Sequence, residues 1–371
     1  MSFPFPEDFV TQAPVISTKR LLQILEAVYG IKSAKCTKLT GYDDLNFLLE
    51  DVRYKDDVSA GRKLICKFSN PIEASLPDLM NEQVYMMNAL GSCGIPVPGI
   101  VRTKKVDNYE IVEMVDGIKL PIRLFEFVEG QTLESVGFND ETISIIGELV
   151  AKFSNASEFN QCLQDTKLFR QHRPLISLEY YKYLEREIDN LLEAGFMTAE
   201  QAEACRRVFK ELEEKIFSNY GDFEQGLIHS DINETNVLLI RDKDNKLKVS
   251  ALLDFGDAHV SLRLFEYSSA ILYIILGMGS EDQVEDWKRV IRTFFRAFIK
   301  ERKSGEFMND IKHCQLAMRA RLVASLIYGL RTVRINYRKE DPSYILKTQS
   351  NGWDVLRSLN DNDLDIPSLI Q

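Results

Sequence analysis

The chain carries the segments HSDINETN at residues 229–236 and LLDFGD at residues 252–257, which lie close together in the sequence. Apolar runs typical of short strands flank them, at Gln225 to Ile228, Val237 to Ile240 and Leu247 to Leu253. Either polar segment alone also fits an ordinary turn, because Asp and Asn are common loop residues. The specific signal is their combination in this order between strands.

This combination is the pattern expected for phosphoryl transfer, His-x-Asp with Asn five residues after the Asp and then Asp-Phe-Gly. The transition state of that reaction leaves the protein mainly to position groups and neutralise charge. It needs a carboxylate at the attacking hydroxyl and oxygen ligands for Mg²⁺. We therefore predict Asp231 and His229 as catalytic residues, and Asn236 and Asp254 as Mg²⁺ ligands.

A phosphate-binding lysine is expected on an upstream strand. In LICKF (residues 64–68), alternation places Lys67 on a half-apolar face. On the following helix Glu82 lies three residues after Leu79 and four before Met86, on an apolar face that looks toward the sheet. Each residue alone also fits a solvated surface charge, but their order along the chain predicts a Lys67–Glu82 ion pair.

Four further residues are predicted to contact the nucleotide. Gly41 and Asn46 belong to a turn that would cover the phosphates, and Glu126 and Val128 would offer backbone groups to the base. A single glycine turn is a weak signal, and a plain edge strand also fits the second pair.

The order of the elements predicts an α+β fold of two lobes, similar to that of protein kinases. Short strands and a helix from Pro77 to Leu90 precede Gly130, the last two strands joined by a hairpin at Asp116-Gly117, and helical periodicity dominates after it. The first lobe would be a small antiparallel sheet with one helix, the second mainly helical. The expected range of the nucleotide-binding lobe is 1–129, with an N-terminal helix at about 17–30 and strands at Thr37 to Leu39, Leu45 to Leu49 and Lys63 to Phe68. The second lobe is expected at 130–371. It would contain the catalytic loop at 226–240 and the metal loop at 252–259.

The composition favours a small-molecule partner. The 371 residues are 45% hydrophobic, enough for a large core, and 56 acidic against 46 basic residues give a net charge of -10. Nucleic-acid binders need a basic surplus, so a cationic or zwitterionic substrate fits better. Six scattered cysteines without a Cys-x-x-Cys pair, no signal peptide and no membrane-spanning stretch predict a cytoplasmic protein, a monomer or weak dimer without membrane or nucleic-acid partners.

On these residues the chain resembles the aminoglycoside phosphotransferase family of kinase-like enzymes, and within it is most similar to the hydroxylysine kinases. The resemblance runs from about Ser17 to Arg338, with the two polar segments as firm anchors. GYDDLN (41–46), GIPVP (94–98) and RLFEFVEG (123–130) are softer ones. It implies a kinase fold with a helical second lobe and an insert at about 159–220 that shapes the substrate pocket. It also implies Mg²⁺ with GTP or ATP, and phosphorylation of an amine-bearing metabolite such as 5-hydroxylysine in lysine degradation.

The chain departs from the family pattern at Ser230, where members usually carry glycine. Serine tolerates positive φ less well, so the backbone of the catalytic loop is expected to be affected. The chain also lacks the Gly-x-Gly-x-x-Gly loop and the Ala-Pro-Glu motif of protein kinases, so a protein substrate is not expected.

Several alternatives stay open. Within the family, choline, ethanolamine, homoserine or an aminoglycoside could be the acceptor, and Asp257, Glu266 or carboxylates of the insert could hold its ammonium group. From other classes, the chain could be a non-catalytic kinase-like scaffold. A hydrolytic metal centre is the third reading, with ligands His229, Asp231, Asp254, Asp257 and His259.

Overall fold

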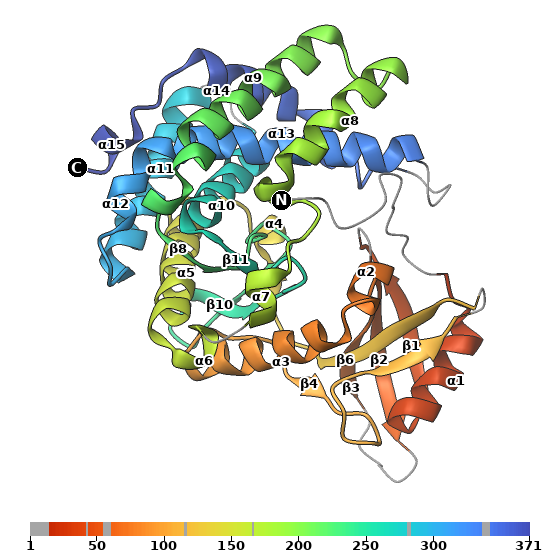
Figure 1. Cartoon of the computed structure of the whole chain (residues 1–371). Coiled ribbons are helices and arrows are strands. Elements are labelled where there is room, and N and C mark those ends of the chain that lie inside the picture. Colours follow the sequence, from red (N-terminus) through yellow and green to blue (C-terminus); the bar gives the residue numbers. More distant parts are fainter. Residues whose placement is uncertain are drawn as a thin grey trace.

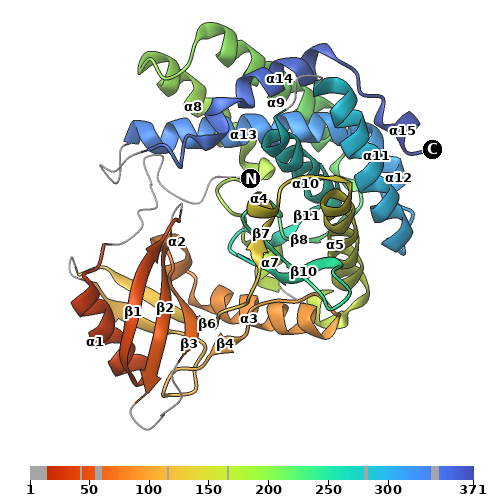
Figure 2. The same ribbon diagram turned by 180° about the vertical axis from the view of Figure 1, so that it is seen from behind.

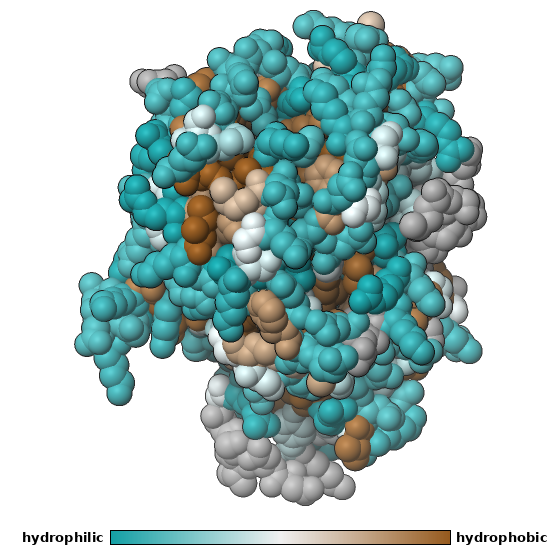
Figure 3. All heavy atoms as spheres, turned by 60° about the vertical axis from the view of Figure 1, so that its left-hand side comes forward, coloured by the Kyte–Doolittle hydropathy of each residue, from teal (hydrophilic) through white to brown (hydrophobic). Residues whose placement is uncertain are grey.

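The computed structural model describes residues 15–41, 44–54, 61–114, 117–164, 167–279, 283–335 and 342–371. Within them the chain forms a smaller lobe built on a sheet and a larger, mainly helical lobe (Figure 1). The predicted α+β, kinase-like two-lobed fold is confirmed. None of the helices in these ranges is long and apolar enough to cross a bilayer. On the face shown in Figure 3, hydrophilic side chains cover most of the surface, with apolar patches between them.

The sheet of the smaller lobe is antiparallel, in the order β1-β2-β3-β6-β4 with β5 paired to β6. The predicted strand at Thr37 starts earlier, at Ile31. Only Ile31 is buried on this edge strand, so its sequence lacks the alternation that would have revealed its full length. The strands are β1 Ile31–Leu39, β2 Leu45–Tyr54, β3 Arg62–Phe68, β4 Ile100–Val101, β5 Glu110–Glu113 and β6 Lys119–Glu126.

Helix α1 (Thr18–Tyr29) covers the apolar face of this sheet. The Ser17 side chain caps its first turn, and Gly30, with φ of 78°, ends it in a left-handed conformation that suits glycine. Its buried Leu21 and Leu25 pack with strand residues such as Phe47 in one hydrophobic core. The predicted N-terminal helix is therefore confirmed, and it supplies one layer of the smaller lobe.

Helix α3 (Pro77–Ser92), which follows the short α2 (Pro71–Ala74), lies between the lobes (Figures 1 and 2). Its Leu79, Met86 and Leu90 belong to the hydrophobic core of the larger lobe and not to that of the sheet. Helix α3 thus links the sheet to the helical lobe.

The larger lobe is built around the long helices α10 and α13, whose side chains are buried along most of their length. Its helices are α4 Leu133–Val136, α5 Asp140–Phe159, α6 Gln161–Gln164, α7 Lys167–Gln171, α8 Tyr181–Glu193, α9 Ala199–Lys215, α10 Arg263–Met278, α11 Gln283–Glu301, α12 Phe307–Asp310, α13 Cys314–Ile335, α14 Gly352–Asp361 and α15 Ile366–Leu369, with 3-10 turns at Leu178–Tyr180, Phe217–Asp222, Ile311–His313 and Lys347–Ser350.

Two small sheets in this lobe position the polar segments. One has the order β10-β9-β7 and the other pairs β11 with β8. Residues 229–236 connect β8 to β9, and residues 253–258 connect β10 to β11, as the flanking apolar runs predicted. The strands are β7 Gln131–Thr132, β8 Gln225–Ile228, β9 Val237–Arg241, β10 Leu247–Leu252 and β11 His259–Leu262.

The linker after β6 passes close to these strands. A Cβ atom on Gly130 would lie 2.5 Å from Ser250 Oγ and 3.1 Å from the Leu239 carbonyl oxygen, so the linker needs glycine here. We propose this passage, between residues 129 and 130, as the boundary between the lobes.

Candidate active site

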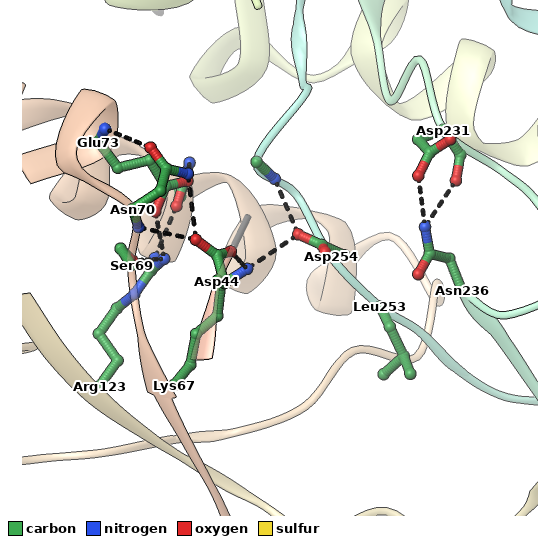
Figure 4. A network of polar contacts seen from close by, with 12 residues as sticks. Asp44, Lys67, Ser69, Asn70, Glu73, Arg123, Asp231, Asn236, Leu253 and Asp254 are labelled. Carbon is green, nitrogen blue, oxygen red and sulfur yellow. Dashed lines mark hydrogen bonds and ion pairs between the residues drawn. The ribbon is translucent and has the colours of Figure 1, made fainter. Parts of the chain in front are cut away.

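Two loops of the larger lobe carry the polar residues of the site. Asn236 donates from Nδ2 to Asp231 Oδ2 at 2.8 Å and to the Asp231 carbonyl oxygen at 3.0 Å (Figure 4). Asn233 donates to the same carboxylate oxygen at 3.0 Å. The two amides therefore fix the carboxylate of Asp231 through Oδ2.

Arg321 of α13 lies against the other oxygen of this carboxylate. Its Nη2 is 3.5 Å from Asp231 Oδ1, and its Nε and Nη2 donate to the Tyr273 hydroxyl at 3.1 and 2.9 Å. Burial raises the pKa of Asp231 to about 6, although the charge of Arg321 opposes the rise. A carboxylate that titrates near neutrality is well suited to accept a proton from an alcohol.

His229 joins the two loops. Its Nδ1 accepts a hydrogen bond from the Asp231 backbone N–H at 3.2 Å, and its Nε2 donates to the Leu253 carbonyl oxygen at 2.9 Å. The ring is fully buried, and burial lowers its pKa to about 4, so it is neutral. Because both ring nitrogens are engaged, the predicted catalytic role of His229 is corrected to a positioning role.

Glu266 of α10 holds the start of the catalytic loop from behind. Its Oε2 accepts from the backbone N–H groups of His229 and, at 3.3 Å, Ser230. The side chain is 1% exposed, and burial raises its pKa to about 7. The predicted contact of Glu266 with a substrate is therefore wrong, because the loop separates it from solvent. Ser230 has φ of 72°, a left-handed conformation that glycine would adopt more easily than serine.

Asp254 and Asn236 offer oxygen atoms to a metal ion. The Leu253 N–H donates to the Asn236 carbonyl oxygen at 2.8 Å, which holds the two loops side by side. Asn236 Oδ1 has no hydrogen-bond partner among the described residues, and the Asp254 side chain is about half exposed, at 48%. An amide oxygen and a carboxylate suit a hard divalent cation such as Mg²⁺. In the ranges covered by the structure, no three His, Cys, Asp or Glu side chains are grouped to hold a metal.

Lys67 reaches this site from β3 of the smaller lobe. Its Nζ lies 3.1 Å from Asp254 Oδ1 and 2.6 Å from Asp44 Oδ2 (Figure 4). Lys67 lowers the pKa of Asp254 to about 2. The structure shows no ion pair between Lys67 and Glu82, so that prediction is wrong and the acidic partners of the lysine are Asp44 and Asp254.

The helical register of α3 explains the error. Gln83, four residues after Leu79, is the buried polar residue of this face, and Glu82 is only half-buried. Gln83 accepts from Arg123 Nη1 at 2.6 Å and donates to Glu73 at 3.2 Å. The face of α3 predicted to carry Glu82 therefore carries the neutral amide of Gln83, which belongs to a buried hydrogen-bond network.

The other predicted nucleotide contacts lie along the smaller lobe and the linker, and remain predictions. A Cβ on Gly41 would lie 2.5 Å from the Asp44 carbonyl oxygen, so this turn requires glycine. Asn46 lies opposite Lys67 in the β2–β3 register. Glu126 donates its N–H to the Gly99 carbonyl oxygen at 2.8 Å, whereas the N–H of Val128 has no partner among the described residues.

The reading as a hydrolytic metal centre is contradicted at His259. Its Nε2 lies 3.2 Å from Ser177 Oγ, its Nδ1 lies 2.7 Å from the Asp257 carbonyl oxygen, and the ring is 1% exposed. Both ring nitrogens are therefore engaged, one with Ser177 of the insert and the other with the Asp257 carbonyl group. Asp257 is a half-buried residue of the metal loop and remains a predicted substrate contact.

Two residues of the site were missed in the sequence. Arg321 is one of several arginines of α13, and nothing in the sequence links it to Asp231, 90 positions away. Asp44 belongs to the quoted turn GYDDLN, where its role as a partner of Lys67 was not inferred.

A lysine, an aspartate–asparagine pair and a second aspartate between two such lobes define a phosphotransferase with a kinase-like fold. Residues 38–301 match the phosphotransferase enzyme family, and the chain belongs to this family.

Similar proteins agree with this assignment. The chain is similar to the hydroxylysine kinase of Mus musculus, with 24% identity over 94% of this chain and 90% of that protein. It is also similar to that of Xenopus laevis, with 22% identity over 94% and 91%. Among solved structures, an amicoumacin kinase superposes with a TM-score of 0.66 at 15% identity, covering 95% of this chain and 94% of the other. An aminoglycoside 2'-phosphotransferase superposes with 0.60 at 17%, covering 95% and 100%.

Proposed function

We propose that this phosphotransferase transfers the γ-phosphoryl group of GTP or ATP to the hydroxyl group of an amine-bearing small metabolite, with 5-hydroxylysine as the first candidate. The observation that carries the proposal is the contact between the lobes, where Lys67 Nζ lies 3.1 Å from Asp254 Oδ1. It brings a phosphate-binding cation next to a metal-binding carboxylate, beside the hydrogen-bonded Asp231 and Asn236.

Each side chain then has one task. Lys67 binds phosphate oxygens. Asn236 and Asp254 would hold Mg²⁺, which would supply neutralisation of the phosphate charge. Asp231 accepts the proton of the acceptor hydroxyl at Oδ1, the oxygen that the two amides leave open. The carboxylate is held in place by these amides and by Arg321, so the acceptor oxygen meets a fixed base.

Two observations support an amine-bearing acceptor. The chain carries a net charge of -10, which suits a cationic or zwitterionic substrate. The two relatives reported above with 22–24% identity over 94% of the chain are hydroxylysine kinases. The fold likeness to an aminoglycoside 2'-phosphotransferase keeps aminoglycosides as a second candidate, together with choline, ethanolamine and homoserine.

The direct test is a phosphate-transfer screen with ATP and GTP against these acceptors and methylthioribose. We expect Asp231→Asn and Asp254→Ala to lower the turnover of the best acceptor by about 10²- to 10⁴-fold, the range for general acid–base groups. The fold should persist, as judged by circular dichroism. Asp244→Asn, in the exposed turn between β9 and β10, is the matched control.

Full activity of either variant would exclude this mechanism. Nucleotide binding without a phosphorylated product across the whole panel would instead favour the non-catalytic scaffold. That alternative gives no reason for Lys67, Asp231, Asn236 and Asp254 to occur together around one site.

A further inference from the structure

Lys67 is an almost buried cation that needs a permanent acidic partner. The residue is 9% exposed, and a buried ammonium group is stable only when it is paired. One of its two partners, Asp254, is the residue that would hold the metal ion. The other partner, Asp44 at 2.6 Å, has no such second task.

The carboxylate of Asp44 is fixed in its orientation. Its Oδ1 accepts hydrogen bonds from the backbone N–H of Asn70 at 2.7 Å and from Asn70 Nδ2 at 3.1 Å. This leaves Oδ2 for Lys67 (Figure 4). Asn70 Oδ1 in turn accepts the N–H of Glu73 at 3.1 Å and so ties the arrangement to the first turn of α2. The Asp44 side chain is 14% exposed, so it is nearly as buried as that of the lysine.

The other nearby carboxylate is already committed. Glu73 Oε2 lies 3.0 Å from Arg123 Nη2, and its Oε1 accepts from Gln83 at 3.2 Å. Arg123 is 3% exposed and needs this partner for the same reason that Lys67 needs its own. Glu73 therefore contributes to the field around Lys67 without pairing with it.

We infer that Asp44 is the carboxylate that positions the phosphate-binding Lys67. It performs the task that the sequence predicts for Glu82 of helix α3. The inference rests on the proposed function, because it assigns Lys67 to nucleotide phosphates. A Cβ atom on Gly41 would lie 2.5 Å from the Asp44 carbonyl oxygen, so Gly41 and Asp44 lie close together.

The test is nucleotide binding, measured by fluorescence titration with labelled ATP and GTP analogues in the presence of Mg²⁺. Asp44→Asn keeps the size of the side chain and removes its charge. We expect its Kd for nucleotide to rise about 10- to 100-fold, as for loss of one member of a buried charge pair. Asp44→Glu should recover part of the affinity, and Glu82→Gln, the matched control, should bind within about twofold of wild type.

A double-mutant cycle separates positioning from a general loss of structure. When Lys67→Met is already present, Asp44→Asn should have no further effect on Kd. A further loss in the double variant, or an Asp44→Asn variant that binds as tightly as wild type or more tightly, would overturn the inference.

The proposed function can be rejected independently of this inference. If the wild-type protein binds nucleotide but phosphorylates no acceptor, the proposed function is wrong, while the comparison of Asp44→Asn with Glu82→Gln still tests the inference. Wild-type protein that binds neither analogue overturns both.

Discussion

At the scale of single residues, Arg321 distinguishes this site from a minimal phosphotransferase centre. The residue is 4% exposed, and its guanidinium group lies between the Tyr273 hydroxyl and Asp231 Oδ1. Replacing it by Met leaves the carboxylate of Asp231 without its cation in a partly buried site. We expect kcat to fall about 10- to 100-fold, as when a preorganised polar group is removed, with little change in the KM for nucleotide. Steady-state kinetics with ATP or GTP measures both constants.

The conservative variants supply the control for this prediction. Arg321→Lys keeps the charge but lacks the planar fork, so it should recover only part of kcat. Tyr273→Phe removes one anchor of the arginine and should have the smaller effect. If Arg321→Met keeps wild-type kcat, or if it raises only the KM for nucleotide, then Arg321 does not act through Asp231.

Which residues could be predicted follows from how local their contacts are. Asp231 and Asn236 are hydrogen-bonded to each other within five positions of the chain, so the motif that predicts them also fixes their geometry. The partner of Lys67 depends on which side chain the fold brings close. Glu82 was a reasonable candidate by spacing, but the register of α3 presents Gln83 instead.

At the scale of elements, the predicted insert at 159–220 is fastened to the rest of the larger lobe by Glu179. This residue lies in the turn before α8 and accepts hydrogen bonds from Ser177, Tyr220 and, on β11, Ser261. Burial alone would raise its pKa, but His259 together with the two serines outweighs burial and lowers the pKa to about 2. We propose that this attachment holds the wall of the substrate pocket.

The lowered pKa of Glu179 predicts that the folded chain loses stability in acid. The unfolded chain binds the proton of Glu179 near pH 4.5, the folded chain only near pH 2. The stabilisation is therefore complete above pH 4.5 and is lost as pH falls toward 2, by ~3 kcal/mol at ~1.4 kcal/mol per pKa unit. Urea unfolding between pH 7 and pH 2.5 measures it. Glu179→Gln should flatten the slope in this window.

Glu203→Gln, at an exposed position of α9, is the matched control and should keep the wild-type slope. An unchanged slope for Glu179→Gln would show that other carboxylates cause the acid instability.

Periodicity reveals long helices best. Helices α5, α9, α11 and α13 each carry an apolar stripe or an apolar run that spans several turns. Short pieces such as α2, α4 and β7 have too few residues for a period to appear, and they form because tertiary contacts hold them.

At the scale of the whole molecule, the described residues form two hydrophobic cores, one in each lobe. One joins α1 to the sheet and the other fills the helical lobe, with α3 contributing its apolar residues to the second. The division into lobes could be predicted because strand-rich and helix-rich stretches are separate in the sequence. It could not be predicted that α3 packs into the core of the helical lobe, because an apolar helical face does not specify which of two cores it joins.

This division predicts two units of local unfolding. Leu25 of α1 and Leu322 of α13 are both fully buried, one in each core, so Leu25→Ala and Leu322→Ala should each cost about 2–5 kcal/mol. In hydrogen exchange followed by mass spectrometry, Leu25→Ala should speed exchange in α1 and β1 to β3, whereas α3 should keep the protection of the helical lobe. Leu322→Ala should give the reverse, with faster exchange in α10, α13 and α3. Uniformly faster exchange in both lobes for either variant would mean that the two cores unfold as one cooperative unit.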